Sequence, residues 1–346
     1  MDYEQPPAQP PFTAPVFHSP VYEPQPKKRS LWRIFSSVLL VLSILANGFL
    51  LLAIVGMAMM MNLGTVSDDI SEKVLVEGST HEKIAAIRIE GVIDGAMSDW
   101  VSVQLDAAEQ DPAVKGLIVR IVSPGGGVAS SDQIHRAISR YKERTGKPVL
   151  AFMQSIAASG GYYSAVACDD IMAEPTVITG SIGVMMNHWV IKDLLEQKLG
   201  IVPVTLKSGL RKDWPSLFSA TTDEQKQYLD EKVIQPAYER FVQLVVEGRK
   251  ERLNEAEVRA LADGSIFSAP EALTKRLIDQ IGYFDEAVAA LSQKAGLTEP
   301  TVVEYEEKLS VMSMLGAQTQ SGLRIDTALL EKMLAPQLMY IWDGQQ

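Results

Sequence analysis

The sequence predicts an α/β fold of repeated βαβ units, preceded by one N-terminal transmembrane helix. From Lys83 to about Ala295, short apolar runs typical of buried parallel strands alternate with amphipathic helical segments. Before them, an apolar run from Ile34 to Met61 contains no charged residue and exceeds the roughly 20 residues that a membrane-spanning helix needs. With 346 residues, 47% of them hydrophobic, the chain is long enough to bury a large core.

The apolar run 34–61 is predicted to be an uncleaved membrane anchor. A secretory signal peptide is the alternative, but its apolar region would be shorter and a cleavage site of small residues should follow. The residues Gly56-Met57-Ala58 fit such a site poorly. Basic residues precede the run and acidic residues follow it, so the positive-inside rule places the N-terminus in the cytoplasm and the rest outside the cell membrane.

Four further segments follow from composition. Residues 1–33 are rich in proline and lack apolar periodicity, which predicts a disordered cytoplasmic tail. Residues 62–82 are polar and acidic and are interpreted as a stalk. Residues 83–295 form the predicted domain, and no internal repeat divides it. Residues 296–346 are a less regular C-terminal extension with one amphipathic stretch at 327–340.

Within the domain, the apolar runs predict a parallel sheet with right-handed crossovers. Strands are expected at 84–89, 116–121 and 148–153, with short strands near Ile171, Ile182 and Val202. Helices are expected at 98–110, at 130–141 with Ser131 and Asp132 as the cap, at 222–250, and on either side of a short strand before 295. The segment 159–168 forms a third crossover.

Charge and cysteine content exclude several classes of protein. The net charge is −11, and the acidic excess lies after the N-terminal tail, which argues against nucleic acid as a partner. The single cysteine, Cys168, excludes an internal disulfide and is expected to be a buried structural thiol. The four histidines are scattered and there is no cysteine cluster, so no zinc site and no cofactor are predicted.

A glycine turn, Ser-Pro-Gly-Gly-Gly at 123–127, lies between a predicted strand and a predicted helix. Pro124 fixes one φ angle and the glycines allow positive φ, so successive N–H groups can face one point and bind an anion. A phosphate is disfavoured because the spacing matches neither the dinucleotide fingerprint nor the P-loop. The remaining interpretations are an oxyanion site and a plain tight turn.

Ser159 is the candidate nucleophile. It lies in Ala-Ala-Ser-Gly-Gly-Tyr-Tyr at 157–163, after a predicted strand and at the start of a helix. Gly160 and Gly161 leave the approach to its Oγ open, and their N–H groups lie at the positive end of the helix dipole. A serine that only caps the helix is the alternative. The G-x-S-x-G elbow is not matched, because Ala157 stands where its first glycine should be.

The base that would activate Ser159 is open between a histidine and a lysine. A lysine can serve when burial keeps it neutral, and Lys207 and Lys212 flank Gly209 in one loop, although either could be a solvated surface charge. Ser181, in Thr-Gly-Ser-Ile-Gly-Val at 179–184, could orient a neutral amine or could be a turn serine. No triad motif surrounds the candidate histidines, which are His81, His135 and His188.

These four motifs, in this order, resemble the bacterial signal peptide peptidase A family in its short, single-domain form. Its members are membrane-anchored serine/lysine proteases of the Clp protease/crotonase-like fold, and the resemblance covers about 83–295. It implies that Ser159 is the nucleophile, Lys212 the general base and Ser181 the residue that orients the lysine. It also implies an oxyanion hole made by the N–H of Gly160 with that of Gly126 or Gly125. Lys207 is not favoured, because the family's base is the second lysine of the loop.

The resemblance further implies the substrate and the assembly. Such a protease degrades remnant signal peptides after their release from secreted preproteins, within or beside the bilayer. It forms a homo-oligomeric ring in which the dyad is shared between subunits. One difference concerns the shape of the substrate groove: residues 213–218 read Asp-Trp-Pro-Ser-Leu-Phe, where relatives usually have smaller residues.

Two alternatives stay open from the sequence. A crotonase-type acyl-CoA hydratase or isomerase would share the fold and the oxyanion site, but it would need a glutamate or a similar acid-base group and no extracytoplasmic anchor. A non-catalytic membrane scaffold of the same fold is the second alternative, and reaction with a serine-directed acylating probe would distinguish it from an enzyme.

Overall fold

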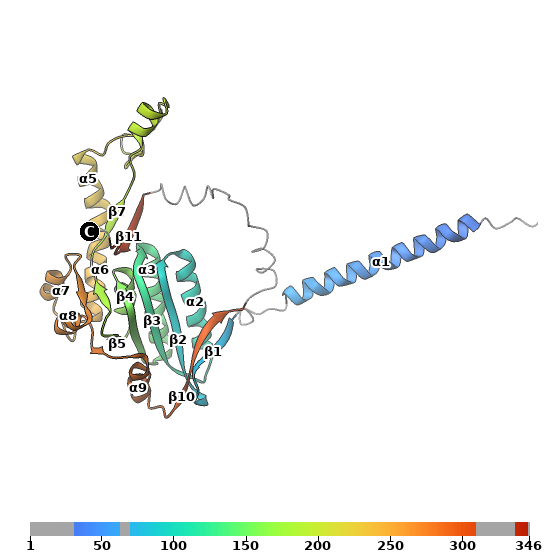
Figure 1. The fold of residues 1–346 in the computed structure, drawn as a ribbon, viewed down its shortest axis with the longest axis horizontal. Coiled ribbons are helices and arrows are strands. Elements are labelled where there is room, and N and C mark those ends of the chain that lie inside the picture. The colour runs from blue at the N-terminus through green and yellow to red at the C-terminus, as the bar shows by residue number, and fades with distance from the viewer. Residues whose placement is uncertain (1–30, 63–69, 309–335, 345–346) are drawn as a thin grey trace, which may run out of the picture. The chain divides into compact units, whose positions relative to one another are not determined.

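The computed structural model describes residues 31–62, 70–308 and 336–344, in two separate units that divide after residue 65 (Figure 1). The described part of the first unit is one helix, α1 (Leu31–Asn62). Its segment Trp32–Met57 has a mean hydropathy of 2.8 and exposes its side chains, so α1 is long and apolar enough to cross a membrane. The tail up to residue 30 lies outside the described residues, as does 63–69 of the expected stalk.

The second unit is built on a mixed sheet with the strand order β1–β10–β2–β3–β4–β5–β9. Every neighbouring pair from β10 to β9 is parallel, which confirms the predicted parallel sheet, and β1 is antiparallel to β10. The strands are β1 (Ile70–Val76), β2 (Ser79–Ile93), β3 (Val114–Gly127), β4 (Val149–Ala158), β5 (Asp170–Ala173), β9 (Gln280–Ile281) and β10 (Pro300–Glu307).

Helices cover both faces of this sheet. Side chains of a strand alternate between its faces, and β2 shows this directly. Ala85 and Ile87 pack in the larger core with residues of α2 (Gly95–Gln110) and α3 (Val128–Thr145), whereas Ile84 and Ala86 pack with residues of α9 (Phe284–Ala295). Burial on both faces explains why β2 and β3 appear in the sequence as continuous apolar runs.

The remaining elements follow in chain order after β4 and complete the described domain. They are α4 (Gly160–Ala165), β6 (Ile178–Gly180), β7 (Met185–Asn187), the π-helical turn η2 (Leu194–Lys198), α5 (Asp223–Leu229), the π-helical turn η3 (Asp230–Ile234), α6 (Gln235–Gly248), α7 (Glu255–Leu261), β8 (Ile266–Ser268), α8 (Ala269–Thr274) and β11 (Gln337–Ile341). The expected helix 222–250 is thus one run of α5, η3 and α6, and Thr222 begins it with a capping box to Gln225.

Two expectations for single elements were wrong. α3 begins after Gly127, so Ser131 lies inside its first turn and donates to the carbonyl of Gly127 instead of capping the helix with Asp132. The strand expected near Val202 is absent, because residues 199–207 form no regular element and pair with no described strand. Ile182 lies in the connection between β6 and β7.

The sheet also extends beyond 83–295. β1 comes from the expected stalk, while β10 and β11 come from the expected C-terminal extension. β10 lies between β1 and β2, and it buries Val302, Val303 and Tyr305. Most of the amphipathic stretch 327–340 lies outside the described residues, and its last residues belong to strand β11.

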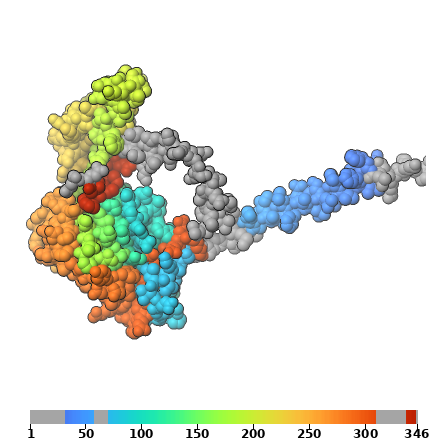
Figure 2. All heavy atoms as spheres, viewed as in Figure 1, coloured from blue at the N-terminus to red at the C-terminus, as the bar shows by residue number. Residues whose placement is uncertain are grey.

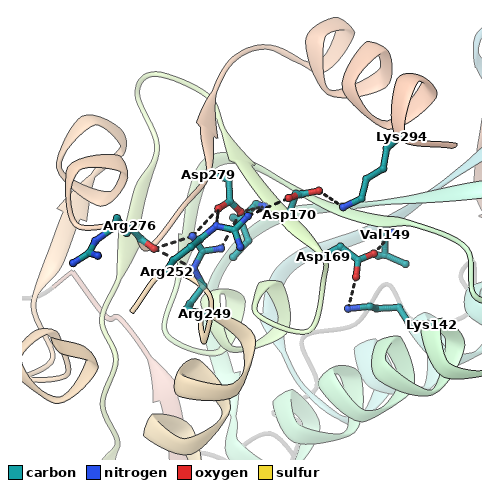
Figure 3. A network of polar contacts seen from close by, with 10 residues as sticks. Lys142, Val149, Asp169, Asp170, Arg249, Arg252, Arg276, Asp279 and Lys294 are labelled. Carbon is teal, nitrogen blue, oxygen red and sulfur yellow. Dashed lines mark hydrogen bonds and ion pairs between the residues drawn. The ribbon is translucent and has the colours of Figure 1, made fainter. Parts of the chain in front are cut away.

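A buried ion-pair network ties the end of α6 to the sheet (Figure 3). The side chain of Arg249 is 1% exposed, and its guanidinium donates to both carboxylate oxygens of Asp279, at 2.9 and 2.8 Å, and to the carbonyl of Arg276. Asp279 also accepts from the N–H of Ile171 on β5 at 2.8 Å, and Arg252 bridges it to Asp170. These contacts satisfy the charges that the fold buries.

We expect Arg249→Met to destabilise the fold by about 3–5 kcal/mol, because it leaves the carboxylate of Asp279 buried without its partner. Chemical unfolding of the full chain in detergent measures this. Arg259→Met is the matched control: its ion pairs with Glu239 and Glu255 are exposed and screened by solvent, so it should destabilise the fold far less than Arg249→Met. Equal destabilisation by the two variants would contradict this account.

The same network predicts an acid limit. Burial raises the pKa of Asp279, but the hydrogen bonds and charge of Arg249 outweigh burial and hold the pKa below 3.8. Because the pKa of Asp279 is lower in the folded state, its ionised carboxylate contributes fully to the free energy of unfolding above its unfolded-state pKa. This contribution is lost as the pH falls through the folded-state pKa. Asp279→Asn should therefore flatten the loss of stability below about pH 4 in an acid unfolding series.

Candidate active site

Ser159 lies at a strained turn between β4 and α4. Its backbone has φ 52° and ψ −113°, a region that costs energy for any residue with a side chain. Its N–H donates to the carbonyl of Gly180 at 2.8 Å, and its carbonyl accepts from the N–H of Tyr163 at 2.8 Å. A strained strand-to-helix turn is typical of a nucleophile whose Oγ must stand clear of the backbone. The predicted strand before Ser159 and helix after it are confirmed.

The glycine turn packs directly against Gly160. A Cβ placed on Gly125, whose φ is 103°, would lie 2.7 Å from the nitrogen of Gly160. A Cβ on Gly160 would lie 3.1 Å from the nitrogen of Gly126. Only glycine allows this approach, and it brings the N–H groups of the turn beside the residue that follows Ser159. The N–H of Gly125 already donates to the hydroxyl of Ser123 at 3.0 Å, which fixes the turn.

A backbone hydrogen bond places the segment of Ser181 next to Ser159. The carbonyl that accepts from Ser159 belongs to Gly180, and the N–H of Ser181 donates to the carbonyl of Ser265 at 2.7 Å. Ser181 lines a cavity of about 340 Å³ together with Tyr238 and Ile341. The structure therefore brings together four of the predicted site elements: Ser159, Gly160, the glycine turn and Ser181.

Within one chain as the structure describes it, Lys212 makes no hydrogen bond with Ser159, Ser181 or the glycine turn. It is exposed in the segment between β7 and α5, which projects from the body of the domain as the yellow-green lobe of Figure 2. Within the described part of the chain, its Nζ makes no hydrogen bond or ion pair. Lys207 differs, because its Nζ lies 2.7 Å from the carboxylate of Asp213.

The histidines do not supply an alternative base. His135 is half-buried, and this burial lowers its pKa to about 4; its ring packs edge-on against Tyr163 at 5.6 Å. The Nε2 of His188 lies 2.7 Å from the hydroxyl of Thr221, and His81 is exposed on β2. Over the described ranges none of them bonds to Ser159.

Cys168 is buried, as predicted, and burial raises the pKa of its thiol. Within the described ranges, no group of three or more His, Cys, Asp or Glu side chains is placed to hold a metal ion.

Strand β11 is the element of the site that the sequence did not reveal. It pairs antiparallel with the glycine turn, with Tyr340 opposite Gly126, and its other edge pairs with β7. The N–H of Trp342 donates to the carbonyl of Pro124 at 2.9 Å. β11, the red strand of Figure 1, is thus an extended segment that runs along the glycine turn. The apolar run at 338–342, shortly after Pro336, was the available signal.

The side chain of Tyr340 fills an aromatic pocket. Its ring is fully buried and stacks on Tyr163 at 4.9 Å, and it contacts Phe241 at the same distance. Its hydroxyl donates to the carbonyl of Ala237 at 2.6 Å. Because Tyr163 follows Ser159 by one helical turn, this pocket lies one turn along α4 from the candidate nucleophile.

A serine on a strained turn, glycine N–H groups packed beside it and an edge that pairs with an extended chain are the parts of a peptidase site. The comparisons with known proteins agree with this class. Residues 141–298 match the model of peptidase family S49. The chain is 37% identical over 301 residues to the "Putative signal peptide peptidase SppA" of Enterococcus faecium, covering 80% of this chain and 86% of the relative. The chain belongs to peptidase family S49.

Two further proteins are similar to parts of the chain. "Protease 4" of Haemophilus influenzae is 30% identical over 254 residues, which cover 69% of this chain and 40% of that protein. A ClpP1 mutant of Listeria monocytogenes aligns with a TM-score of 0.40 and 18% identity, over 59% of this chain and 94% of its own. The family favours the peptidase over the acyl-CoA hydratase and scaffold alternatives.

Proposed function

We propose that the protein is a membrane-anchored serine endopeptidase with a Ser159–Lys212 dyad that degrades remnant signal peptides after their release from preproteins. The observation that supports it best is β11, an extended segment paired with the glycine turn beside Ser159. A peptide substrate that takes the place of β11 would bind by the same antiparallel pairing, since main-chain hydrogen bonds supply affinity for any extended sequence. The names of the relatives support signal peptides as the substrate class.

In the proposed reaction, the Oγ of Ser159 attacks the scissile carbonyl while neutral Lys212 takes its proton. The N–H groups of Gly160 and Gly126 stabilise the oxyanion. Gly126 is preferred to Gly125, because the N–H of Gly125 is bonded to the hydroxyl of Ser123. Lys212 then protonates the leaving amine, and water activated by the same lysine hydrolyses the acyl-enzyme.

The choice of Lys212 over Lys207 rests on their partners. A general base must bring its nitrogen to the nucleophile, and the Nζ of Lys207 is already engaged by the carboxylate of Asp213 at 2.7 Å. The Nζ of Lys212 bonds to nothing within the described residues, so it is free to meet Ser159 and Ser181 of another copy.

The segment between β7 and α5 supports a dyad shared between subunits of a ring. It exposes a run of large apolar side chains, with Leu206 95% and Val204 79% exposed. Such patches mark protein–protein contacts. A second copy that covers this surface would carry Lys212 to its Ser159. The exposed large apolar residues of the segment are Trp189, Val190, Leu194, Leu199, Ile201, Val202, Val204, Leu206, Leu210 and Phe218.

We expect Ser181→Ala to lower kcat about 10- to 100-fold with little change in KM, because a lost hydrogen bond to neutral Lys212 costs about 1–3 kcal/mol. Steady-state hydrolysis of a synthetic signal peptide measures both constants. Ser155→Ala is the matched control, since Ser155 has a positive φ of 52°, close to the 50° of Ser181, but is exposed on β4. An unchanged kcat in Ser181→Ala would leave Ser181 as a turn residue.

The proposed topology places the N-terminal tail in the cytoplasm and the catalytic domain outside. The flanking charges of α1 support this orientation. Protease added to intact spheroplasts should degrade the domain and leave a protected fragment that contains the tail. A domain that is degraded only after the membrane is permeabilised would contradict the orientation.

A further inference from the structure

The loop that carries Lys212 is closed by an ion pair. The Nζ of Lys207 lies 2.7 Å from the carboxylate of Asp213 and 3.2 Å from the carbonyl of Leu210. A hydrogen bond from the N–H of Lys212 to the carbonyl of Gly209, at 3.1 Å, forms a turn inside the loop. The backbone on both sides of Lys212 is therefore constrained while its side chain stays exposed.

A second contact attaches the loop to α5. The guanidinium of Arg211, the residue before Lys212, lies over two aromatic rings, 5.6 Å from the centre of Trp214 and 4.7 Å from that of Tyr228. The two rings meet edge-on at 5.6 Å. Trp214 belongs to the loop and Tyr228 to α5, and both are half-buried. We call Arg211, Trp214 and Tyr228 the stacked cluster.

A lysine base needs such support. Its side chain has four rotatable bonds, and a reacting group displaced by about 1 Å can cost a hundredfold in rate. Lys212 lies on a segment whose apolar side chains are mostly exposed, so packing within the domain does not fix its backbone. Together with an exposed ion pair between Arg211 and Glu224 at 3.9 Å, the stacked cluster ties this loop to α5, and it gives the large residue Trp214 a role.

We propose that the stacked cluster of Arg211, Trp214 and Tyr228 is a positioning device that holds the backbone of Lys212 where its amine can reach the nucleophile. This inference rests on the proposed function of Lys212 as the base. The three residues do not touch the reacting atoms, so they act through Lys212. Substrate pairing along the glycine turn does not involve them, and their loss should affect the chemical step and leave peptide binding intact.

Tyr228→Ala in the full chain tests the proposal, with a synthetic signal peptide as substrate. We expect kcat to fall at least about tenfold with KM unchanged, while the oligomeric state in detergent stays that of the parent protein. Tyr228→Phe keeps the ring and should restore kcat to near the parent value. Lys226→Ala is the control on the same helix: it removes an exposed ion pair with Asp223 and should leave kcat unchanged.

Three results would overturn the positioning role. They are an unchanged kcat in Tyr228→Ala, a loss that Tyr228→Phe shares, and a loss that accompanies dissociation of the oligomer, which would make Tyr228 an interface residue. Failure of the proposed function is distinguishable, because it requires an active Lys212→Ala. An inactive Lys212→Ala together with a fully active Tyr228→Ala rejects the stacked cluster alone.

Discussion

Lys212→Ala and Ser159→Ala should each lower kcat for peptide hydrolysis by at least about a thousandfold and to a similar residual rate, because nucleophile and base act as one unit. Ser159 lies at the strained turn beside Gly160. Among the described residues, no side chain that could replace Lys212 as the base bonds to Ser159. Initial rates on a synthetic signal peptide, with folding checked by circular dichroism, measure the effect.

Lys207→Ala is the matched control for the base. The ammonium of Lys207 is bound to Asp213. Lys207→Ala therefore removes an ion pair within the loop but no proton acceptor of the reaction. It should keep at least about a tenth of the parent kcat. Lys212→Arg should be inactive, because arginine stays protonated. An inactive Lys207→Ala beside an active Lys212→Ala would assign the base to Lys207 instead.

Two inactive variants should restore activity when they share one oligomer. If the dyad is formed between subunits, some junctions between Ser159→Ala and Lys212→Ala chains contain an intact Ser159 facing an intact Lys212. The exposed apolar segment that carries Lys212 is the surface that would make this junction. We expect activity to rise from the background of either variant to a clear fraction of the parent rate.

Co-expression with two different affinity tags, followed by purification on both, isolates the mixed oligomers for this measurement. Doubly tagged oligomers that stay inactive would show that each chain carries its own complete dyad. Chains that never purify together would contradict the ring itself. The parent protein carrying both tags controls for any effect of the tags.

The local parts of the fold and site were predictable from the sequence because they depend on short-range signals. The apolar runs of β2, β3 and β4 are buried on both faces, and the strand-turn-helix around Ser159 follows from its glycines. The cap expected at Ser131 was misplaced by four residues, because α3 begins directly after Gly127 of the glycine turn.

The long-range parts could not be predicted. β10 enters the sheet between β1 and β2, and β11 pairs with a turn more than two hundred residues earlier in the chain. A single sequence carries no record of such partners, because strand pairing depends on where distant segments meet. The strand expected near Val202 was wrong for the same reason. The apolar side chains there are exposed, and no strand of the described chain pairs with this segment.

The central claim is that Ser159 forms an acyl-enzyme with a peptide. The most direct measurement is mass spectrometry of the full chain in detergent, quenched in acid during turnover of a synthetic signal peptide. We predict an adduct with the mass of the N-terminal product fragment, mapped to the peptide that contains Ser159 and absent from Ser159→Ala. Peptide hydrolysis that proceeds equally in Ser159→Ala, or an adduct on any other residue, would contradict the account.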